Sequence, residues 1–217
     1  MSEIEELLMK HCPKGVPNVA LEEVIDDLRT GLNPRSNFQL NTPDATNYYV
    51  TVRELNGFGL TITEKTDRVN DEGLKLILRR SRLKKGDVLF SGTGTIGRTS
   101  LLHEAPTNWG IKEGVYAITP VHSKLDARYL IYMLTSPSKL DRIKELADGS
   151  TVASISMASL RKLEIGLPSL EVQLAIVNIL DKFTELEAEL EAELESRKSQ
   201  FEYYRNKLLT FKDMEVA

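Results

Sequence analysis

The sequence predicts an α+β fold, in which a mixed domain with many short strands is followed by a long C-terminal coiled-coil helix. Up to residue 167, short β-branched or aromatic runs alternate with turn signals and short amphipathic stretches, which is typical of a mixed domain. From Leu170 to Phe211 the chain contains neither glycine nor proline and is rich in Glu, Leu, Ala and Lys, a composition typical of a long helix. We therefore expect a domain at residues 1–167 and a helix at residues 168–217.

Short strands are expected at five places in the first domain, where β-branched and aromatic residues gather. They are residues 47–55, 59–64, 86–91, 98–102 and 114–120. The pair Asn56-Gly57 lies between the first two segments and is typical of a tight turn.

Helices are expected at residues 21–28, 126–136 and 138–147. Asp126 can cap the N-terminus of the second helix, and Pro137 limits its other end.

The C-terminal segment has a heptad pattern sustained over five repeats, broken only at Glu187 and Arg197. Such a pattern favours a coiled coil over a surface helix, and a helix of this length is about 60 Å long. Its apolar stripe requires a partner helix; a helix folded back on its own domain is the alternative. The expected dimer seam consists of Ile176, Leu180, Phe183, Leu190, Leu194, Phe201, Tyr204 and Leu208.

Composition excludes several classes of protein. The chain has 217 residues, of which 41% are hydrophobic and 28% charged, as in ordinary globular proteins. No apolar run approaches the ~20 residues of a membrane span, and the acidic N-terminus is not typical of a signal peptide. The single cysteine, Cys12, fits a reducing cytoplasm. The three histidines are scattered, so no metal site is expected.

Positive charge is concentrated in residues 75–112, which carry eight basic and two acidic side chains although the whole chain has a net charge of −4. This concentration is what a surface that binds nucleic-acid phosphates requires. The basic candidates for phosphate contact are Arg79, Arg80, Arg82, Lys84, Lys85, Arg98 and Lys112.

A glycine-rich loop lies within this basic segment, where Gly92, Gly94 and Gly97 spell G-x-G-x-x-G after a predicted strand. A dinucleotide-binding loop requires the third glycine to open a helix, but residues 98–102 read as a strand and Pro106 follows soon after. The P-loop pattern also fails, since no Lys-Ser/Thr pair follows. Two interpretations remain: a turn whose glycines only satisfy positive φ, or a loop that approaches DNA closely.

Base edges are usually read by Arg, Asn, Gln, Ser and Thr side chains. By location, the candidates are Thr93, Thr95, Arg98 and Asn108, with Ser150 and Thr151 in a second turn of small residues. Trp109, the only tryptophan, either stacks near DNA or belongs to the core.

Three stretches together resemble the specificity subunits of type I restriction–modification enzymes. They are Gly86-Asp87-Val88-Leu89-Phe90, the turn Gly149-Ser150-Thr151, and "IGLPSLEVQLAIVNIL" at residues 165–180. Many relatives have a doubled proline and a Glu-Gln pair where this chain has Leu167-Pro168 and Val172-Gln173. Full-length members resemble two such units in tandem, whereas this chain has one target recognition domain and one spacer helix. It therefore looks like a half subunit.

The resemblance implies a DNA-reading role without catalysis. The recognition domain would read half of a bipartite site on double-stranded DNA, and two long helices would pair antiparallel in a homodimer. Adenine methylation would belong to a modification subunit that binds S-adenosylmethionine, and cleavage to a restriction subunit that uses ATP, if one is present. This chain is then expected to hold no cofactor and to have no catalytic residues.

Two other functions remain open from the sequence. One is a protein-only scaffold or anti-restriction decoy, which would bind the modification subunit without reading DNA. The other is a nucleotide-dependent enzyme that uses the glycine loop, which the residues after Gly97 disfavour. The acidic outer face of the long helix, Glu185 to Glu195, is either a solvated surface or a docking surface for the modification subunit.

Overall fold

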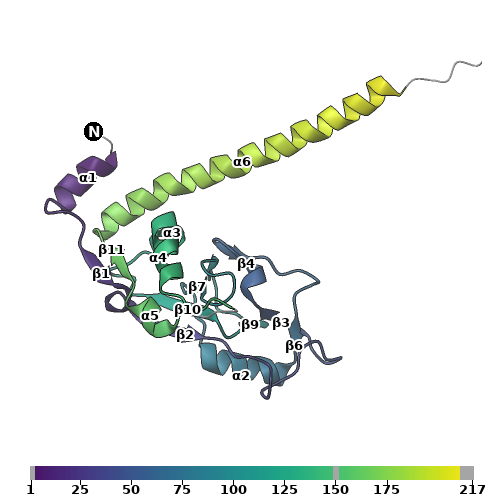
Figure 1. Cartoon of the computed structure of the whole chain (residues 1–217), viewed down its shortest axis with the longest axis horizontal. Coiled ribbons are helices and arrows are strands. Elements are labelled where there is room, and N and C mark those ends of the chain that lie inside the picture. The colour runs from purple at the N-terminus through teal and green to yellow at the C-terminus, as the bar shows by residue number, and fades with distance from the viewer. Residues whose placement is uncertain (1–2, 149–151, 211–217) are drawn as a thin grey trace, which may run out of the picture. The chain divides into compact units, whose positions relative to one another are not determined.

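The computed structural model describes residues 3–148 and 152–210 (Figure 1). The chain forms two compact units, Met1–Ala175 and Ile176–Ala217. The first unit is a mixed domain of short strands and helices, and the second is the greater part of one helix. The predicted α+β class with a long C-terminal helix is confirmed.

A four-stranded antiparallel sheet forms the centre of the first unit. Its strands are β2 (Ile25–Thr30), β7 (Val88–Ser91), β8 (Thr99–Leu101) and β10 (Val115–Pro120). They lie in the order β2-β10-β7-β8. β7 and β10 are buried along their whole length, as expected for the two inner strands of a covered sheet.

A second, three-stranded sheet contains the only parallel pairing in the described parts of the chain. Its strands are β3 (Asn47–Val50), β6 (Arg68–Val69) and β9 (Trp109–Ile111). β3 lies in the middle, antiparallel to β6 and parallel to β9. Val50 and Ile111 are partners in the parallel pair, and both are fully buried.

Two short antiparallel pairs complete the strand pairing. β4 (Leu55–Asn56) and β5 (Gly59–Leu60) form a hairpin, which confirms the predicted turn at Asn56-Gly57. β1 (Asn18–Ala20) pairs with β11 (Glu164–Gly166). This second pair joins the beginning and the end of the domain.

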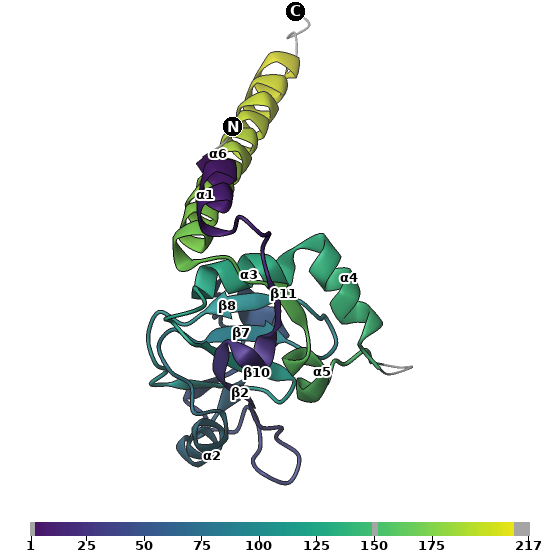
Figure 2. The same ribbon diagram turned by 90° about the vertical axis from the view of Figure 1, so that its left-hand side faces the viewer.

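Helices cover the two ends of the four-stranded sheet. α3 packs against β7 and β8, whereas α2 packs against β2 and β9 (Figures 1 and 2). The helices are α1 (Glu3–His11), α2 (Asp71–Ser81), α3 (Ala127–Thr135), α4 (Pro137–Glu145), α5 (Met157–Arg161) and α6 (Leu170–Leu209). The Asn70 side chain caps α2 and the Asp126 side chain caps α3, each by accepting a hydrogen bond from a first-turn backbone N–H.

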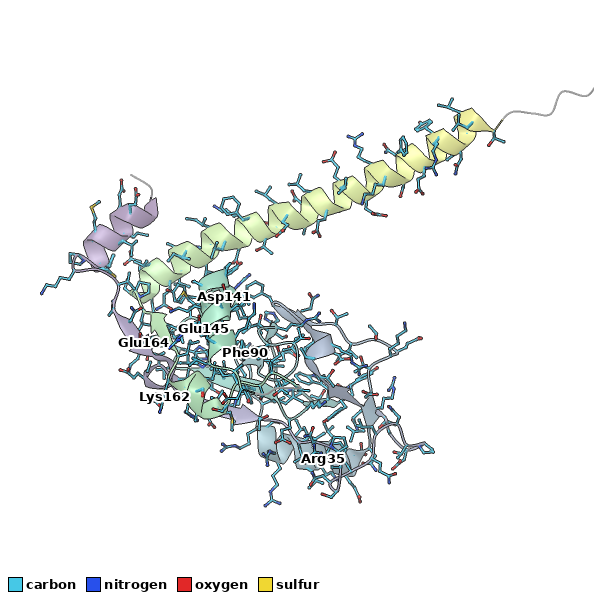
Figure 3. The ribbon with its side chains drawn as sticks, in the orientation of Figure 1. Arg35, Phe90, Asp141, Glu145, Lys162 and Glu164 are labelled. Atoms are coloured by element: carbon cyan, nitrogen blue, oxygen red, sulfur yellow. The ribbon has the colours of Figure 1, made fainter. Side chains whose placement is uncertain are left out.

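The core lies between these elements. Phe90 on β7 is fully buried and points into the interior (Figure 3). One apolar cluster includes Leu89 and Ile111 with Trp109 packed against it, and a second includes Tyr49 and Ile77. Complete burial of one such aliphatic side chain contributes roughly 1.5–3 kcal/mol. Trp109 is therefore partly a core residue.

The prediction of a helix at residues 21–28 is wrong. The segment forms a 3₁₀ turn at Leu21–Glu23 and then enters β2. Its apolar residues fit a helical period and are buried. From Ile25 onward, however, these residues belong to a strand. Pairing with β10, in which Leu28 lies opposite Ile118, satisfies the backbone of an inner strand and overrides local preference.

The other predicted elements are present, some of them shortened. The strands expected at 86–91, 98–102 and 114–120 and the helices at 126–136 and 138–147 are confirmed. The strand expected at 47–55 is interrupted by a 3₁₀ turn at Val52–Glu54, where the Glu54 carboxylate accepts from the Thr51 backbone N–H. The strand expected at 59–64 pairs only over its first two residues.

The start of α6 is anchored to the first unit by Gln173, which is fully buried. Its side-chain oxygen accepts from the Asp126 backbone N–H at 2.9 Å, and its side-chain nitrogen donates to the carbonyls of Lys124 and Pro168 at 2.8 and 2.9 Å. Gln173 belongs to the stretch that resembles specificity subunits. Its role here is to satisfy buried backbone groups.

Candidate nucleic-acid interface

The glycine loop between β7 and β8 is a closed hairpin that opens no helix. The Ser91 hydroxyl donates to the Thr95 carbonyl at 2.6 Å and accepts from the Arg98 backbone N–H at 2.8 Å. The chain then enters β8 at Thr99. Because a dinucleotide site needs a helix N-terminus at this point, the loop cannot hold a pyrophosphate in that way.

The loop is bonded to the segment that follows the second turn of small residues. Gly94 N–H donates to the Ala153 carbonyl at 2.9 Å, and the hydroxyls of Thr93 and Ser154 lie 3.0 Å apart. The glycine loop and residues 153–154 are therefore neighbours in space, although some sixty positions separate them along the chain. The predicted residues Ser150 and Thr151 themselves lie outside the described residues.

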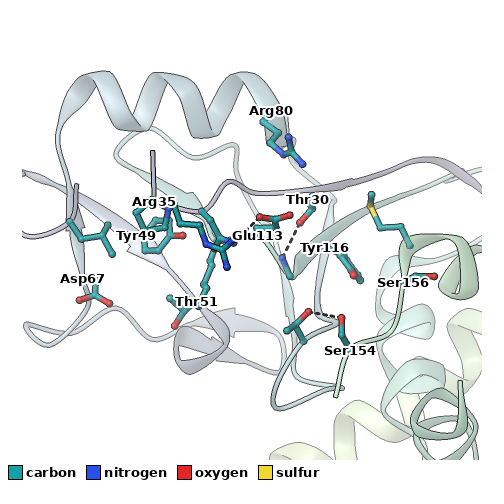
Figure 4. Close-up of a pocket in the computed structure, with 17 residues that line it drawn as sticks. Thr30, Arg35, Tyr49, Thr51, Asp67, Arg80, Glu113, Tyr116, Ser154 and Ser156 are labelled. Carbon is teal, nitrogen blue, oxygen red and sulfur yellow. Dashed lines mark hydrogen bonds between the residues drawn. The ribbon is translucent and has the colours of Figure 1, made fainter. Parts of the chain in front are cut away.

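A cleft of about 830 Å³ opens beside this junction (Figure 4). Its walls come from the end of β2, the loop that follows it, β3, the end of α2, the turn between β9 and β10, and residues 154–157. Three predicted DNA-contacting residues line it: Arg80, Thr93 and Lys112. Residues far apart in the sequence thus meet in one polar depression.

Gly31 allows one wall of the cleft to form. A Cβ atom at this position would lie 1.8 Å from the Ile111 carbonyl oxygen, so no other residue fits. The close approach places the loop after β2 against β9, and Leu32 N–H donates to the same carbonyl at 3.3 Å. The following residues, Asn33 to Arg35, therefore lie at the cleft.

Charges of both signs line the cleft. Arg35, Arg80 and Lys112 are exposed cations, and Arg35 has a left-handed backbone with φ of 34°. Of the two acidic residues, Asp67 is paired with Arg53 at 2.8 Å and also accepts from Asn41. The other, Glu113, accepts a hydrogen bond from the Asn33 side chain at 2.7 Å.

Two tyrosines form neutral parts of the wall. The Tyr49 hydroxyl donates to the Leu32 carbonyl at 2.8 Å, and the Tyr116 hydroxyl donates to the Ile155 carbonyl at 2.6 Å. Burial, and to a smaller degree the nearby negative charge of Glu113, raises the pKa of both phenols. Both hydroxyls are therefore protonated at neutral pH and hold the wall in place.

The other predicted contact residues do not line the cleft. Thr95 and Arg98 lie in the glycine loop, and Asn108 is an exposed residue just before β9. Arg79 and Arg82 lie at the end of α2, and Lys84 and Lys85 lie in the turn before β7. The cationic candidates are thus all exposed, but only Arg80 and Lys112 among them line the cleft.

Within residues 3–148 and 152–210, Arg82 is the one predicted basic contact that is committed to an ion pair. Its guanidinium lies 2.9 Å from the carboxylate of Asp27. The side chains of Arg79, Arg80, Lys84, Lys85, Arg98 and Lys112 lie within no ion-pair distance of a described carboxylate. Exposed cations without partners are what phosphate contact requires.

The Gly86-Asp87-Val88-Leu89-Phe90 motif serves the fold. Asp87 is fully buried and lies 2.6 Å from the guanidinium of Arg29, which is 5% exposed. The carboxylate also accepts from the Thr119 hydroxyl at 2.5 Å and from the Lys84 backbone N–H at 2.8 Å. Asp87 thus joins β2, β7 and β10, and it fixes the turn that carries Lys84 and Lys85.

Sequence reasoning missed most of the polar residues of the cleft, among them Asn33, Arg35 and Glu113. The first two occur in a polar loop with glycine and proline, "GLNPRSN", and such loops often carry binding residues. Glu113 gave no comparable signal, because its place in the cleft depends on long-range pairing.

Two further classes of site find no support in the described parts of the chain. No group of three or more His, Cys, Asp or Glu side chains there is placed to hold a metal ion. Among the described helices, none combines the length and apolar character needed to cross a membrane.

The sequence matches the family described as type I restriction modification DNA specificity domain over residues 13–196, which is most of the chain. The protein therefore belongs to this family.

Among particular relatives, a putative type I restriction enzyme specificity subunit of Haemophilus influenzae, S.HindORF215P, is 33% identical over 132 residues. The match covers 59% of this chain and 33% of that protein. The EcoR124I/EcoR124II specificity subunit of Escherichia coli is 47% identical over 96 residues, which cover 41% of this chain and 22% of the relative. This chain thus matches a third or less of the length of these curated relatives.

Solved structures share the fold at low identity. The S subunit of a type I system from Mycoplasma genitalium matches with a TM-score of 0.55 and 22% identity, over 88% of this chain and 45% of that one. A chain from a study of type I R-M system assembly matches with a TM-score of 0.62 and 22% identity, over 95% of this chain and 50% of that one. Each solved chain is about twice as long as the matched part.

Proposed function

We propose that this chain is a DNA sequence-recognition subunit of a type I restriction–modification enzyme and reads one half of a bipartite site. The observation that carries the proposal is the polar cleft with its cations Arg35, Arg80 and Lys112, found in a chain of this family. Arg80 and Lys112 lie at the cleft, and Arg79, Lys84, Lys85 and Arg98 are exposed and form no ion pair with a described carboxylate. Exposed cations position a protein on the DNA backbone, and polar side chains between them contact base edges.

A homodimer would supply the second half of the site. The apolar residues of α6 from Phe183 onward are exposed in the single chain, with Phe183 and Leu190 both 65% exposed and Leu208 70% exposed. Exposed leucine and phenylalanine at heptad spacing favour pairing with a second helix. In an antiparallel homodimer two identical recognition domains would read a palindromic site with a fixed gap.

The chemistry would belong to partner chains in the cytoplasm. The modification subunit would bind S-adenosylmethionine and methylate adenine at the site that this chain selects, and a restriction subunit would cleave DNA where one is present. This chain would contribute no catalytic group.

The test is co-expression of the full chain with its modification subunit, followed by mapping of methylated adenines across the host DNA. A palindromic motif with a fixed gap is the expected result, because two identical heads would read inverted half-sites. An asymmetric bipartite motif would contradict the homodimer but retain DNA reading. An intact complex that methylates nothing would contradict the proposal and favour the decoy function.

A further inference from the structure

A carboxylate in a cleft that contacts DNA is favourable in few arrangements. Phosphate oxygens are acceptors and repel it, so a carboxylate is favourable there only where it is neutralised or where it meets a donor from a base. Of the two carboxylates in the cleft, Asp67 is already held by Arg53. Glu113 is different, because no described cationic nitrogen lies within ion-pair distance of it.

The single described hydrogen-bond partner of the Glu113 side chain is neutral. The Asn33 side-chain nitrogen donates to one carboxylate oxygen of Glu113 at 2.7 Å. This bond joins the loop after β2 to the turn between β9 and β10, so it fixes the direction of the carboxylate. The second oxygen and the remaining lone pairs are available to a donor that enters the cleft.

The surroundings favour a base over any other donor. Arg80, at the end of α2, and Arg35, in the loop after β2, both line the cleft that Glu113 borders (Figure 4), and Lys112 is its neighbour in the chain. These cations can contact phosphates on either side of a base that lies over Glu113. The arrangement places one acceptor among cationic groups. It fits a DNA duplex whose phosphates contact the cations while an amino group on a base edge donates to Glu113.

We propose that Glu113 reads the exocyclic amino group of one base, N4 of cytosine or N6 of adenine, by accepting a hydrogen bond from it. In the major groove these are the amino donors, whereas guanine O6 and thymine O4 are acceptors that a carboxylate would repel. Glu113 is thereby a specificity-determining residue of the recognition domain. The inference rests on the proposed DNA-reading function and adds one residue and one class of base to it.

The experiment is selection of binding sites from a randomised duplex library by the full chain copurified with its modification subunit. Wild type is compared with Glu113→Gln, which keeps size and shape. Because the Asn33 side-chain nitrogen keeps the remaining oxygen as its acceptor, the new amide nitrogen, a donor, replaces the oxygen that faces the base. We expect the wild-type motif to contain one position with cytosine or adenine at which Glu113→Gln loses about 10-fold in discrimination. Preferences at the other positions stay unchanged, because their contacts are intact.

A second probe removes the donor from the DNA. A duplex with purine in place of adenine, or 2-pyrimidinone in place of cytosine, lacks the amino group at the identified position. It should bind wild type about 10-fold more weakly than the natural duplex and should leave Glu113→Gln binding unaltered. Glu64→Gln is the matched control, because it removes the same charge at an exposed position outside the cleft.

The outcomes separate this inference from the function on which it rests. A wild-type complex that selects no motif overturns the proposed DNA reading, and this inference with it. A clear wild-type motif that Glu113→Gln leaves unaltered at every position overturns the inference alone. Equal loss of preference in Glu113→Gln and Glu64→Gln also overturns it, because the effect would then be one of net charge.

Discussion

Replacing Asp87 by alanine should strongly lower the free energy of unfolding of the recognition domain. The change removes a buried carboxylate and deprives the guanidinium of Arg29, 5% exposed, of its nearer partner at 2.6 Å, so that the Asp27 carboxylate at 3.6 Å is left as its ion-pair partner. Removal of one member of a buried ion pair costs about 3–5 kcal/mol, and the bonds from Thr119 and Lys84 are lost as well. We expect a loss of about 4 kcal/mol, a large share of the ~5–15 kcal/mol of a typical domain.

Urea unfolding followed by Trp109 fluorescence measures this loss, because the chain contains a single tryptophan and it packs against the core cluster of Leu89 and Ile111. With a denaturant dependence of about 2 kcal/mol per molar urea, the midpoint should fall by about 2 M.

A double-mutant cycle separates the ion pair from simple loss of packing. Arg29→Met removes the other charge, so Arg29→Met with Asp87→Ala should be less unstable than the sum of the two single changes by about 2 kcal/mol or more. Additive losses, or a loss below about 1 kcal/mol for Asp87→Ala alone, would refute the structural role assigned to this motif.

Three further predictions concern the surface, the helix and pH. Replacing Arg80 and Arg98 by alanine should weaken DNA binding and lower the slope of log K against log salt by about one unit each; an unchanged slope in filter binding would exclude these contacts. Placing aspartate at Leu190 and Leu194, 65% and 55% exposed, should give monomers in sedimentation, and a surviving dimer would refute the seam. Burial raises the pKa of Tyr129 to about 12, above ~10 in the unfolded chain. Stability from this proton is complete below about pH 10 and is lost as pH rises to about 12. Tyr129→Phe should flatten that fall in urea titrations at several pH values, and an equally steep fall would contradict the assignment.

The elements that could be predicted are those whose sequence signals are local and agree with burial. The strand that became β10 is a β-branched and aromatic run ended by Pro120, and α3 begins at a capping aspartate. The helix α6 followed from its heptad spacing and its lack of glycine and proline. In these cases propensity, pattern and caps favour the same structure.

Prediction failed where tertiary pairing decides. Residues 21–28 have helical spacing but form a 3₁₀ turn and then the first part of β2, because the backbone of β10 needs a partner on that side. α2 was missed because Gly73 and a cluster of charges obscure its apolar face, although Leu74 and Ile77 are buried.

The candidate site could be predicted only in part, because long-range pairing also decides which residues meet there. Arg80, Thr93 and Lys112 were predicted from charge and residue type, and the cleft brings them together with Asn33, Arg35 and Glu113. Contact between the loop after β2 and the turn before β10 depends on the approach of Gly31 to Ile111. No local pattern encodes an approach across eighty positions of the chain.

The pairing of β1 with β11 has a consequence for how such a protein can change its target. Asn18 lies opposite Gly166, so the chain enters and leaves the recognition domain at one place, and everything that lines the cleft lies between these two positions. A segment whose two ends meet can be exchanged as a unit without strain elsewhere. Recombination with joints in these two strands would therefore transfer a complete reading surface onto an unchanged helix, and new specificity would be inherited as one block.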